Sequence, residues 1–316
     1  MEKPLRGTIL QHNEVSPNLP AFISSAEEKT KRAFYEFFAA ELTNHHTREC
    51  YMRDVRRFAA WCEDRGFKVE TVSTIHLAAY REALRKEVSA PTVKRHFSAL
   101  RRLFSWWVEK GVLERNPVRE VKTESFSRSE GKTPAFDLED MQALLSSMTE
   151  PHLLNLRDRA MIGVMAYTFA RVDAVCKLKR KDYYISGRRF YLRLDEKGGK
   201  QREIPCNHRL EEFLEEYLAA VGELEPNAPL FRSIRGRNGK LGEGAMRRTD
   251  VYAMVQRRVK IAGIEGKFSC HSFRATGITT FLENGGTLEK AQWIAGHADS
   301  RTTKLYDRRS LRAGIE

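Results

Sequence analysis

Apolar residues in the first third of the chain recur at intervals of three and four positions, which is typical of helices that bury one face. Two such stripes comprise Tyr51, Val55, Phe58 and Cys62, and then Val93, Phe97, Leu100, Phe104 and Trp107. Ser89 provides a start signal before the second stripe, and Gly111 provides a stop signal after it. Because 27–42 and 74–85 show similar patterns, residues 25–121 are predicted to form a bundle of about four helices.

Two stretches without hydrophobic periodicity are expected to lie outside the folded domains. Residues 1–24 are polar and contain prolines, and they are predicted to form a loose N-terminal arm. Residues 122–133, which contain the serine-rich text TESFSRSEGKT, are predicted to be a linker. The chain is therefore expected to comprise an arm, a helical bundle at 25–121, a linker and a second domain at 134–316.

The second predicted domain mixes helical and strand-like patterns. Helices are predicted at 137–148, 158–170, 209–220 and 250–262. Two short β-like runs, 188–194 and 202–206, flank the charged, glycine-containing turn DEKGGKQ, which favours a β-hairpin. Residues 235–244 are rich in glycine and are predicted to form a loop. The expected fold class is mainly α, with a helical bundle followed by a mixed α/β domain that is mostly helical and has a small antiparallel sheet.

The charge of the chain indicates the kind of partner that it binds. Its 316 residues include 55 Lys and Arg against 42 Asp and Glu, which gives a formal net charge of +13 at pH 7. A strongly basic chain most often binds a polyanion, and nucleic acid is the commonest one. The alternative is a solvated basic surface that maintains solubility.

Other features argue against a membrane or secreted protein. The apolar run at 161–170 is far shorter than the ~20 residues that a membrane-spanning helix needs. The N-terminal text MEKPLRGTIL lacks the apolar core of a signal peptide. The five cysteines are scattered and form no C-x-x-C pair, so neither a disulfide framework nor a zinc site is expected. This pattern fits reduced thiols in the cytoplasm.

Basic residues gather on the polar side of the second predicted helix. Lys94 and Arg101 are seven positions apart, as are Arg95 and Arg102, so each pair projects from nearly the same side. No acidic residue lies between Lys94 and Arg102, so these cations are expected to repel one another unless an anion neutralises them. The face is predicted to contact DNA or RNA, and the alternative is an ordinary solvated helix surface.

Six residues spread over some 135 positions form the strongest chemical pattern in the sequence. They are Arg171 after the apolar run, Lys197 in the hairpin turn, His271 and Arg274 three positions apart, His297 after a glycine, and Tyr306 nine positions later. Taken singly, each of these residues is more often a cap, a packing group or a structural hydrogen-bonding group. Taken in this order and spacing, they make the chain resemble the tyrosine recombinase (phage integrase) family over nearly its whole length.

This resemblance implies a Xer-like site-specific DNA recombinase or integrase. It implies an N-terminal SAM-like helical domain that binds DNA and a C-terminal tyrosine recombinase catalytic domain. In this family a tyrosine attacks a DNA phosphodiester and forms a 3′-phosphotyrosyl intermediate, and strand exchange passes through a Holliday junction in a tetramer. The intermediate stores the energy of the broken bond, so religation is expected to need no ATP. Integration, excision and resolution of replicon dimers all use this chemistry, and the sequence does not select among them.

The resemblance also implies a role for each candidate catalytic residue. These roles are nucleophile for Tyr306, base for His271, acid for Lys197, and support of the phosphate or of proton transfer for His297. The guanidinium groups of Arg171 and Arg274 would bind the non-bridging phosphate oxygens, because they match an oxyanion in geometry and stay protonated. No metal and no cofactor are expected, since these cations can replace the charge of a metal ion.

The implied partners are DNA and further copies of this chain. They comprise double-stranded DNA recombination sites, a homo-tetramer assembled on DNA, and in addition an accessory DNA-bending or directionality factor. The candidate DNA contacts in the bundle are Arg48, Lys94, Arg95 and Arg101. No membrane partner is expected, and the protein is expected to be cytoplasmic and associated with the nucleoid.

Several alternatives stay open at this point. The family usually has an acidic residue three positions after the first arginine, but Ala174 stands there and Asp173 comes one position earlier. Lys200 is an alternative to Lys197 as the catalytic lysine. Only ten residues follow Tyr306, so the contact with a neighbouring subunit is expected to be short or built otherwise. The rival functions are a non-catalytic DNA-binding regulator, a type IB topoisomerase-like or telomere-resolving enzyme, and a nuclease.

Overall fold

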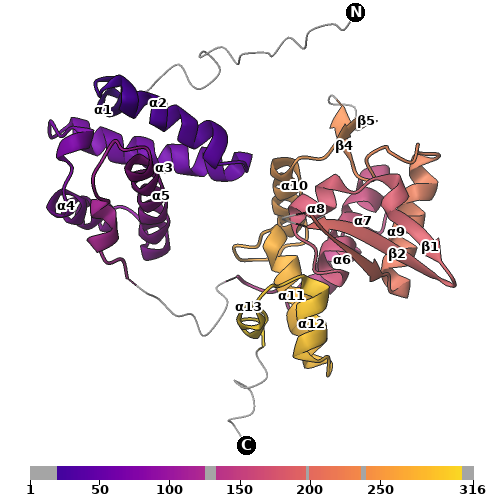
Figure 1. Cartoon of the computed structure of the whole chain (residues 1–316). Helices are drawn as coiled ribbons and strands as arrows, with labels where there is room; N and C mark the ends of the chain where they lie inside the picture. The colour runs from indigo at the N-terminus through magenta and orange to yellow at the C-terminus, as the bar shows by residue number, and fades with distance from the viewer. Residues whose placement is uncertain (1–19, 125–132, 197–198, 236–239, 308–316) are drawn as a thin grey trace, which may run out of the picture. The chain divides into compact units, whose positions relative to one another are not determined.

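The computed structural model describes residues 20–124, 133–196, 199–235 and 240–307. The chain divides into two compact units, Met1–Phe126 and Ser127–Glu316 (Figure 1). Each unit has its own hydrophobic core. Most of the predicted arm and linker lies outside the described residues, and so does the candidate catalytic Lys197. Across the described ranges, every helix is too short or too polar to cross a membrane.

The N-terminal unit is a helical bundle, as its apolar stripes predict. Its elements are α1 (Ala21–Ser24), α2 (Glu28–Glu36), the π-helical turn η2 (Phe37–Glu41), α3 (His45–Glu63), η3 (Val69–Thr71), α4 (Thr74–Arg85), α5 (Ala90–Glu109) and η4 (Pro117–Glu120). The predicted stripe of α5 lies in the core, where Phe97, Leu100 and Trp107 are fully buried. Burial of such a face, rather than intrinsic helix propensity, supplies most of the stability of a helix in a folded protein.

Two details of this unit differ from the sequence prediction. The end of the predicted arm, Ala21–Ser24, is a short helix, and its Phe22 and Ile23 are buried in the core. The π-helical turn Phe37–Glu41 ends the helix predicted at 27–42, and both phenylalanines of this turn are buried. Both segments bury additional aromatic or aliphatic side chains in the core.

The C-terminal unit is mostly helical and contains two small antiparallel sheets, so the predicted fold class is confirmed. Its helices are α6 (Leu138–Ser146), α7 (Leu153–Tyr167), α8 (Val172–Lys177), η5 (Arg180–Asp182), α9 (His208–Val221), α10 (Arg248–Ile261), α11 (Cys270–Glu283), α12 (Leu288–Ala295) and α13 (Ser300–Lys304). Its strands are β1 (Tyr183–Ser186), β2 (Arg189–Glu196), β3 (Lys200–Pro205), β4 (Arg232–Arg235) and β5 (Lys240–Ala245). The predicted hairpin is β2–β3, and the sequence analysis missed β1, which pairs with β2.

Two local predictions in this unit are wrong. The helix predicted at 158–170 is α7, which ends before that range does, so a short segment separates it from Arg171 at the start of α8. Of the loop predicted at 235–244, Arg235 lies in strand β4 and residues 240–244 lie in strand β5, whereas residues 236–239 are outside the described residues; the pairing of β4 with β5 places Ile234 opposite Leu241. Cross-strand pairing outweighs the low strand propensity of the glycines in this segment.

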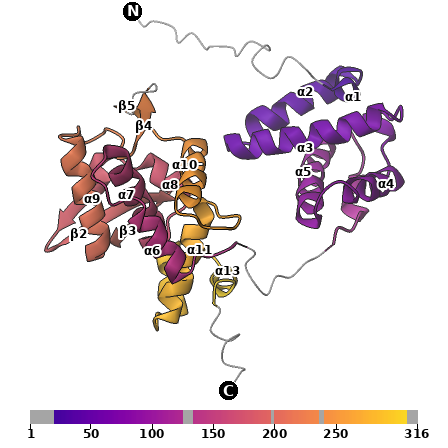
Figure 2. The same ribbon diagram turned by 180° about the vertical axis from the view of Figure 1, so that it is seen from behind.

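A close approach between α7 and α11 positions the last helices of the chain. Gly277 on α11 lies against the end of α7, where an added Cβ would be 2.7 Å from the ring of Phe169 and closer still to the carbonyl oxygen of Ala166. Figure 2 shows α7 between α9 and α11, and both of these helices contact it. The helices α11, α12 and α13 then enclose a second, smaller core that includes Tyr306.

Candidate active site

Tyr306 follows α13 and is fixed by contacts from three helices. Its side chain is 8% exposed and belongs to the small core formed by α11, α12 and α13. Its ring stacks on that of His297, with ring centroids 6.1 Å apart and an interplanar angle of 9°. The hydroxyl of Thr279 donates a hydrogen bond of 3.2 Å to the Tyr306 carbonyl oxygen. These contacts place the phenol hydroxyl toward His271.

His271, in the first turn of α11, lies beside the tyrosine hydroxyl. Its Nε2 is 2.9 Å from Oη of Tyr306, which is hydrogen-bonding distance. Desolvation by the surrounding protein lowers the pKa of His271, and the positive charges of Arg274 and Arg171 lower it further, although part of the ring stays open to solvent. The imidazole is therefore neutral at neutral pH and is able to accept the phenol proton.

Burial and nearby charge act in opposite directions on the tyrosine. Burial raises the pKa of Tyr306, whereas the positive charges of Arg274 and Arg171 act to lower it. The phenol is therefore protonated at neutral pH and needs a base to become a strong nucleophile. The arrangement of a neutral imidazole against a protonated phenol supplies that base.

Arg274 lies one turn after His271 on α11 and is almost completely buried. Its side chain is 1% exposed, Nη1 donates to the carbonyl oxygen of Phe169, and Nη2 donates to that of Ala295 at 2.5 Å. Burial lowers the pKa of Arg274 to about 10, so the group keeps its charge at neutral pH. Its Nε is buried and has no hydrogen-bond partner among the described residues. The positive charge of this guanidinium acts on Tyr306 and favours an anionic group beside the phenol.

The backbone at the end of α7 is shaped to bind Arg274. Phe169 has a φ of +53°, a left-handed conformation that is rare for residues other than glycine. Its carbonyl oxygen accepts from Arg274, and two residues later Arg171 occupies the N-cap position of α8. The same short segment therefore positions both arginines.

Arg171 contacts a carboxylate that the sequence analysis did not single out. Its Nη1 donates to Oε2 of Glu196, at the end of β2, and Oε1 of Glu196 accepts from Nη2 of Arg202 at 2.5 Å. Asp173, which the sequence suggested as a substitute for the missing acid, instead pairs with Lys177 at 2.7 Å, and Ala174 is buried. The only sequence signal for Glu196 is its place directly before Lys197 in the hairpin turn.

His297 is the buried residue whose ring stacks on that of Tyr306. Its Nδ1 is 2.9 Å from the hydroxyl oxygen of Thr303, and its side chain is 9% exposed. Burial, together with the charges of Arg274 and Arg171, lowers the pKa of His297 to about 3. The preceding Gly296 ends α12 with a φ of +60°, and a Cβ there would lie 2.8 Å from Nε of Arg202. Glycine at this position therefore allows both the left-handed turn and the close approach of that arginine.

The structure thus brings together five of the six candidate catalytic residues. They are Arg171, His271, Arg274, His297 and Tyr306. Lys197 lies outside the described residues. Lys200 begins β3, where it is exposed and opposite Glu196 in the register, so the choice between the two lysines stays open.

In the N-terminal unit, the candidate DNA contacts Arg48, Arg95 and Arg101 form hydrogen bonds with other residues of the protein. Arg48 donates to the carbonyl oxygen of Leu42 at 2.8 and 3.2 Å, and Arg101 donates to that of Val121 at 2.8 Å. Arg95 pairs with the buried carboxylate of Asp54 on α3. Lys94 is exposed on the surface of α5.

The repulsion inferred for the basic helix is wrong for two of its residues, because acids from other helices neutralise them. Arg95 donates to Oδ1 of the fully buried Asp54 on α3 at 2.7 Å. Arg102 donates to Oε1 of Glu41 at 2.8 Å. The absence of acids within the helix itself therefore says little about its electrostatic balance, and these two arginines do not by themselves require a polyanion.

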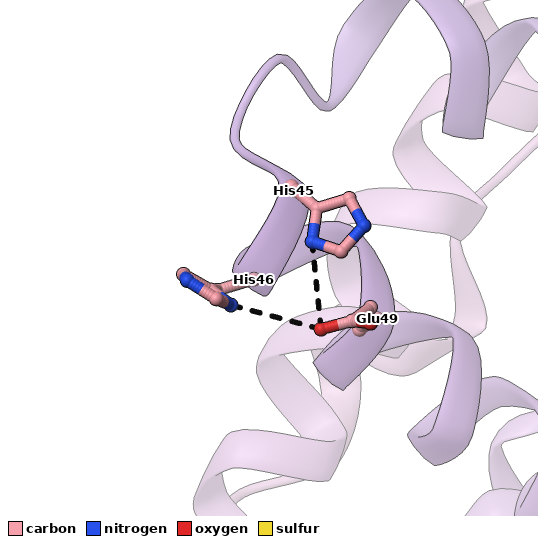
Figure 3. A group of neighbouring side chains, drawn as sticks. All are labelled: His45, His46 and Glu49. Atoms are coloured by element: carbon pink, nitrogen blue, oxygen red, sulfur yellow. Dashed lines mark ion pairs between the residues drawn. The ribbon is translucent and has the colours of Figure 1, made fainter. Parts of the chain in front are cut away.

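A group of potential metal ligands lies at the start of α3, as Figure 3 shows. The Nδ1 atoms of His45 and His46 each lie 3.6 Å from Oε2 of Glu49. These side chains are exposed by 71%, 57% and 63% respectively. Because all three side chains are largely exposed to solvent, we assign no metal site to this group.

Comparisons with known proteins show the family of this chain. Residues 135–311 match the phage integrase family, and residues 32–111 match the N-terminal SAM-like domain of phage integrases. The tyrosine recombinase XerC of Pelobacter propionicus is 30% identical over 270 residues, which cover 84% of this chain and 85% of that protein. The tyrosine recombinase XerD of Listeria innocua serovar 6a is 29% identical over 269 residues, which cover 83% of this chain and 87% of that protein.

Solved structures share the fold. A structure of the XerH site-specific recombinase bound to its palindromic difH substrate aligns with a TM-score of 0.69 and 18% identity, covering 93% of this chain and 90% of that chain. A lambda integrase tetramer bound to a Holliday junction aligns with a TM-score of 0.67 and 18% identity, covering 88% of this chain and 76% of that chain. The predicted combination of a SAM-like domain with an integrase catalytic domain is confirmed by these matches.

Proposed function

Since this chain belongs to the phage integrase family and is a tyrosine-type site-specific recombinase, we propose that Tyr306 cleaves DNA by direct attack on a phosphodiester. The tyrosine oxygen would form a bond to phosphorus while the bond from phosphorus to the 5′-oxygen breaks. The products are a 3′-phosphotyrosyl linkage and a 5′-hydroxyl end. The observation that carries the proposal is the 2.9 Å contact between Nε2 of His271 and the hydroxyl of Tyr306, beside two arginines.

Proton transfer in this proposal requires a base and an acid. His271 accepts the phenol proton, because its lowered pKa keeps the imidazole neutral at neutral pH. The leaving 5′-oxygen needs a proton, and Lys197 at the hairpin turn is the proposed donor. His297 stacks on the tyrosine ring, and its pKa of about 3 means that it accepts no proton at neutral pH. Its proposed role is therefore to orient the nucleophile.

Charge on the phosphate is neutralised by guanidinium groups in this proposal. Arg274 has a buried Nε without a hydrogen-bond partner among the described residues, and Arg171 has a side chain that is 40% exposed. Donors placed in advance around the phosphate lower the cost of the charge that develops as the bonds rearrange. A metal ion is not needed for this step, and the phosphotyrosyl bond conserves the energy that religation uses.

The proposed substrate is a pair of double-stranded DNA recombination sites. The XerH and lambda integrase structures contain DNA, and one of the latter is a tetramer on a Holliday junction. By similarity, we propose that four copies of this chain exchange strands between two sites through such a junction. The N-terminal unit would bind the duplex, with Lys94 as the exposed candidate on α5, and the protein would act with the DNA in the cytoplasm.

The test is covalent trapping on suicide DNA substrates, whose nicked ends diffuse away after cleavage and prevent religation. The wild-type protein is expected to form an SDS-resistant adduct in the presence of a chelator, and Tyr306→Phe is expected to form none. Arg274→Ala is expected to bind DNA and to lose cleavage by at least about 100-fold, because one phosphate-binding donor set is removed. An adduct with Tyr306→Phe would refute the nucleophile, and a folded wild type that binds DNA without cleaving it would favour a regulator.

A further inference from the structure

Glu196 is a buried carboxylate between two arginines of the candidate site. Its side chain is 5% exposed, and its two oxygens accept from different guanidinium groups, Oε2 from Arg171 and Oε1 from Arg202. Burying a carboxylate is costly unless it is paired and hydrogen-bonded, and both of its oxygens are satisfied here. The arrangement is therefore a fixed element of the site.

Arg202 anchors this carboxylate to the helix that ends beside the tyrosine. Its Nη1 donates to the carbonyl oxygen of Ile294 and, at 3.3 Å, to that of Trp293, both in the last turn of α12. Its side chain is 11% exposed. Glu196 is thus held on one side by an arginine that is itself fixed, so its other oxygen presents a defined position to Arg171.

The contact leaves most of Arg171 available for another ligand. Within the described residues, only Nη1 of its guanidinium forms a hydrogen bond, although the group carries five N–H donors. Its side chain is 40% exposed, in contrast to the buried carboxylate. Helix α8 packs against β2, so the backbone positions of the two residues are also coupled.

The charge of Glu196 also affects the second arginine of the site, Arg274. Burial and the positive charge of Arg171 lower the pKa of Arg274, and the negative charge of Glu196 opposes this shift. Asp173, the other acid near Arg171 in sequence, forms its ion pair with Lys177 and is 45% exposed. Glu196 is therefore the acid that acts on both site arginines.

We propose that Glu196 is a positioning residue for the cleavage reaction, orienting the guanidinium of Arg171 so that its remaining N–H groups bind the scissile phosphate. This inference rests on the proposed function. It assigns to β2 the acid that the family usually has three positions after the first arginine, where this sequence has Ala174 and left open whether Asp173 substitutes for it. Loss of the carboxylate would leave Arg171 present and charged but without a fixed orientation.

The experiment measures single-turnover cleavage of a suicide DNA substrate by full-length Glu196→Gln. Because a displacement of about 1 Å in a positioning group can cost about 100-fold in rate, we expect cleavage to slow by about 10–100-fold. Affinity for the same DNA and the melting temperature are measured in parallel, and affinity is expected to change by no more than about twofold. The matched control is Glu203→Gln, which removes an exposed Glu–Arg pair at 3.1 Å on the same sheet and is expected to cleave as wild type does.

A double-mutant comparison separates positioning from a merely structural role. In an Arg171→Ala background, adding Glu196→Gln is expected to change the remaining rate by less than about twofold, because the group that Glu196 orients is gone. The inference would be overturned if Glu196→Gln reduced the cleavage rate equally in the wild-type and Arg171→Ala backgrounds, or if Glu196→Gln alone cleaved at the wild-type rate. If Glu196→Gln does not fold, Glu196→Asp keeps the charge, shortens the side chain and is expected to show the same dependence on Arg171.

The wild-type reaction keeps this inference distinct from the proposed function. An adduct that depends on Tyr306, together with Glu196→Gln cleavage at the wild-type rate, refutes the inference alone. Failure of the folded wild type to form any adduct on cleavable sites refutes both.

Discussion

Replacement of Gly277 by alanine tests whether the contact between α7 and α11 sets the geometry of the site. The added Cβ would lie 2.7 Å from ring carbons of Phe169 and would overlap the carbonyl oxygen of Ala166, whereas real Cβ contacts are almost never shorter than 3.0 Å. The overlap involves backbone, so α11 must move away from α7 rather than a side chain rotating. Arg274, one turn earlier on α11, would then lose its fit to the carbonyl oxygen of Phe169.

The expected magnitude follows from two opposing terms. Overpacking costs about 1–3 kcal/mol, with the upper part of this range expected when backbone is displaced, and alanine regains up to ~1 kcal/mol of helix propensity. The free energy of unfolding of the C-terminal unit should therefore fall by about 2 kcal/mol, which lowers its melting temperature by about 4–8 °C. A movement of about 1 Å at Arg274 should also slow cleavage by about 100-fold.

The assay is differential scanning calorimetry of the whole protein, combined with suicide-substrate cleavage. The matched control is Gly163→Ala on α7, where the new Cβ meets the ring of Phe213 at 3.0 Å and a methyl of Leu210 at 3.3 Å. These are side-chain atoms that can shift, so this variant should stay within about 1 kcal/mol of wild type. Gly277→Ala with wild-type stability and wild-type cleavage would refute the reasoning.

Two further predictions concern buried charge. Burial lowers the pKa of His297 from 6.5 to about 3, so between these pH values the unfolded state binds a proton that the folded state does not. The free energy of unfolding should therefore fall by about 2 kcal/mol from pH 7 to about pH 5. In urea denaturation of His297→Gln, the difference in the free energy of unfolding between pH 7 and pH 5 should be smaller by this amount. A difference equal to that of the wild type would contradict the prediction. In the N-terminal unit, Arg95→Ala should lower the free energy of unfolding by about 1–3 kcal/mol, because it removes a partner of the buried Asp54. Arg102→Ala should lower it by less than about 1 kcal/mol, because its pair with Glu41 is exposed. Calorimetry that finds equal losses in the two variants would show that burial of the acid is not the deciding factor.

The candidate site illustrates which residues a sequence can identify. His271, Arg274 and Tyr306 were predicted because their residue types and spacing match a family pattern, and the structure brings them together. Glu196 was missed, since one carboxylate among 42 acidic residues carries no signal until its distance to Arg171 is known. The end of α7 was also misplaced, because the left-handed residue that follows this helix, Phe169, is not a glycine that would mark the turn.

The sequence by itself determined the helical bundle, the β2–β3 hairpin and the order of the candidate catalytic residues. These features depend on local periodicity, turn composition and spacing, which can be read along the chain. Only the tertiary structure decided which charges are paired. The basic face of α5 illustrates this point, since Arg95 finds its acid 41 positions earlier on α3. Ion pairs depend on distances of a few ångströms between segments that are far apart in sequence, and folding alone sets those distances.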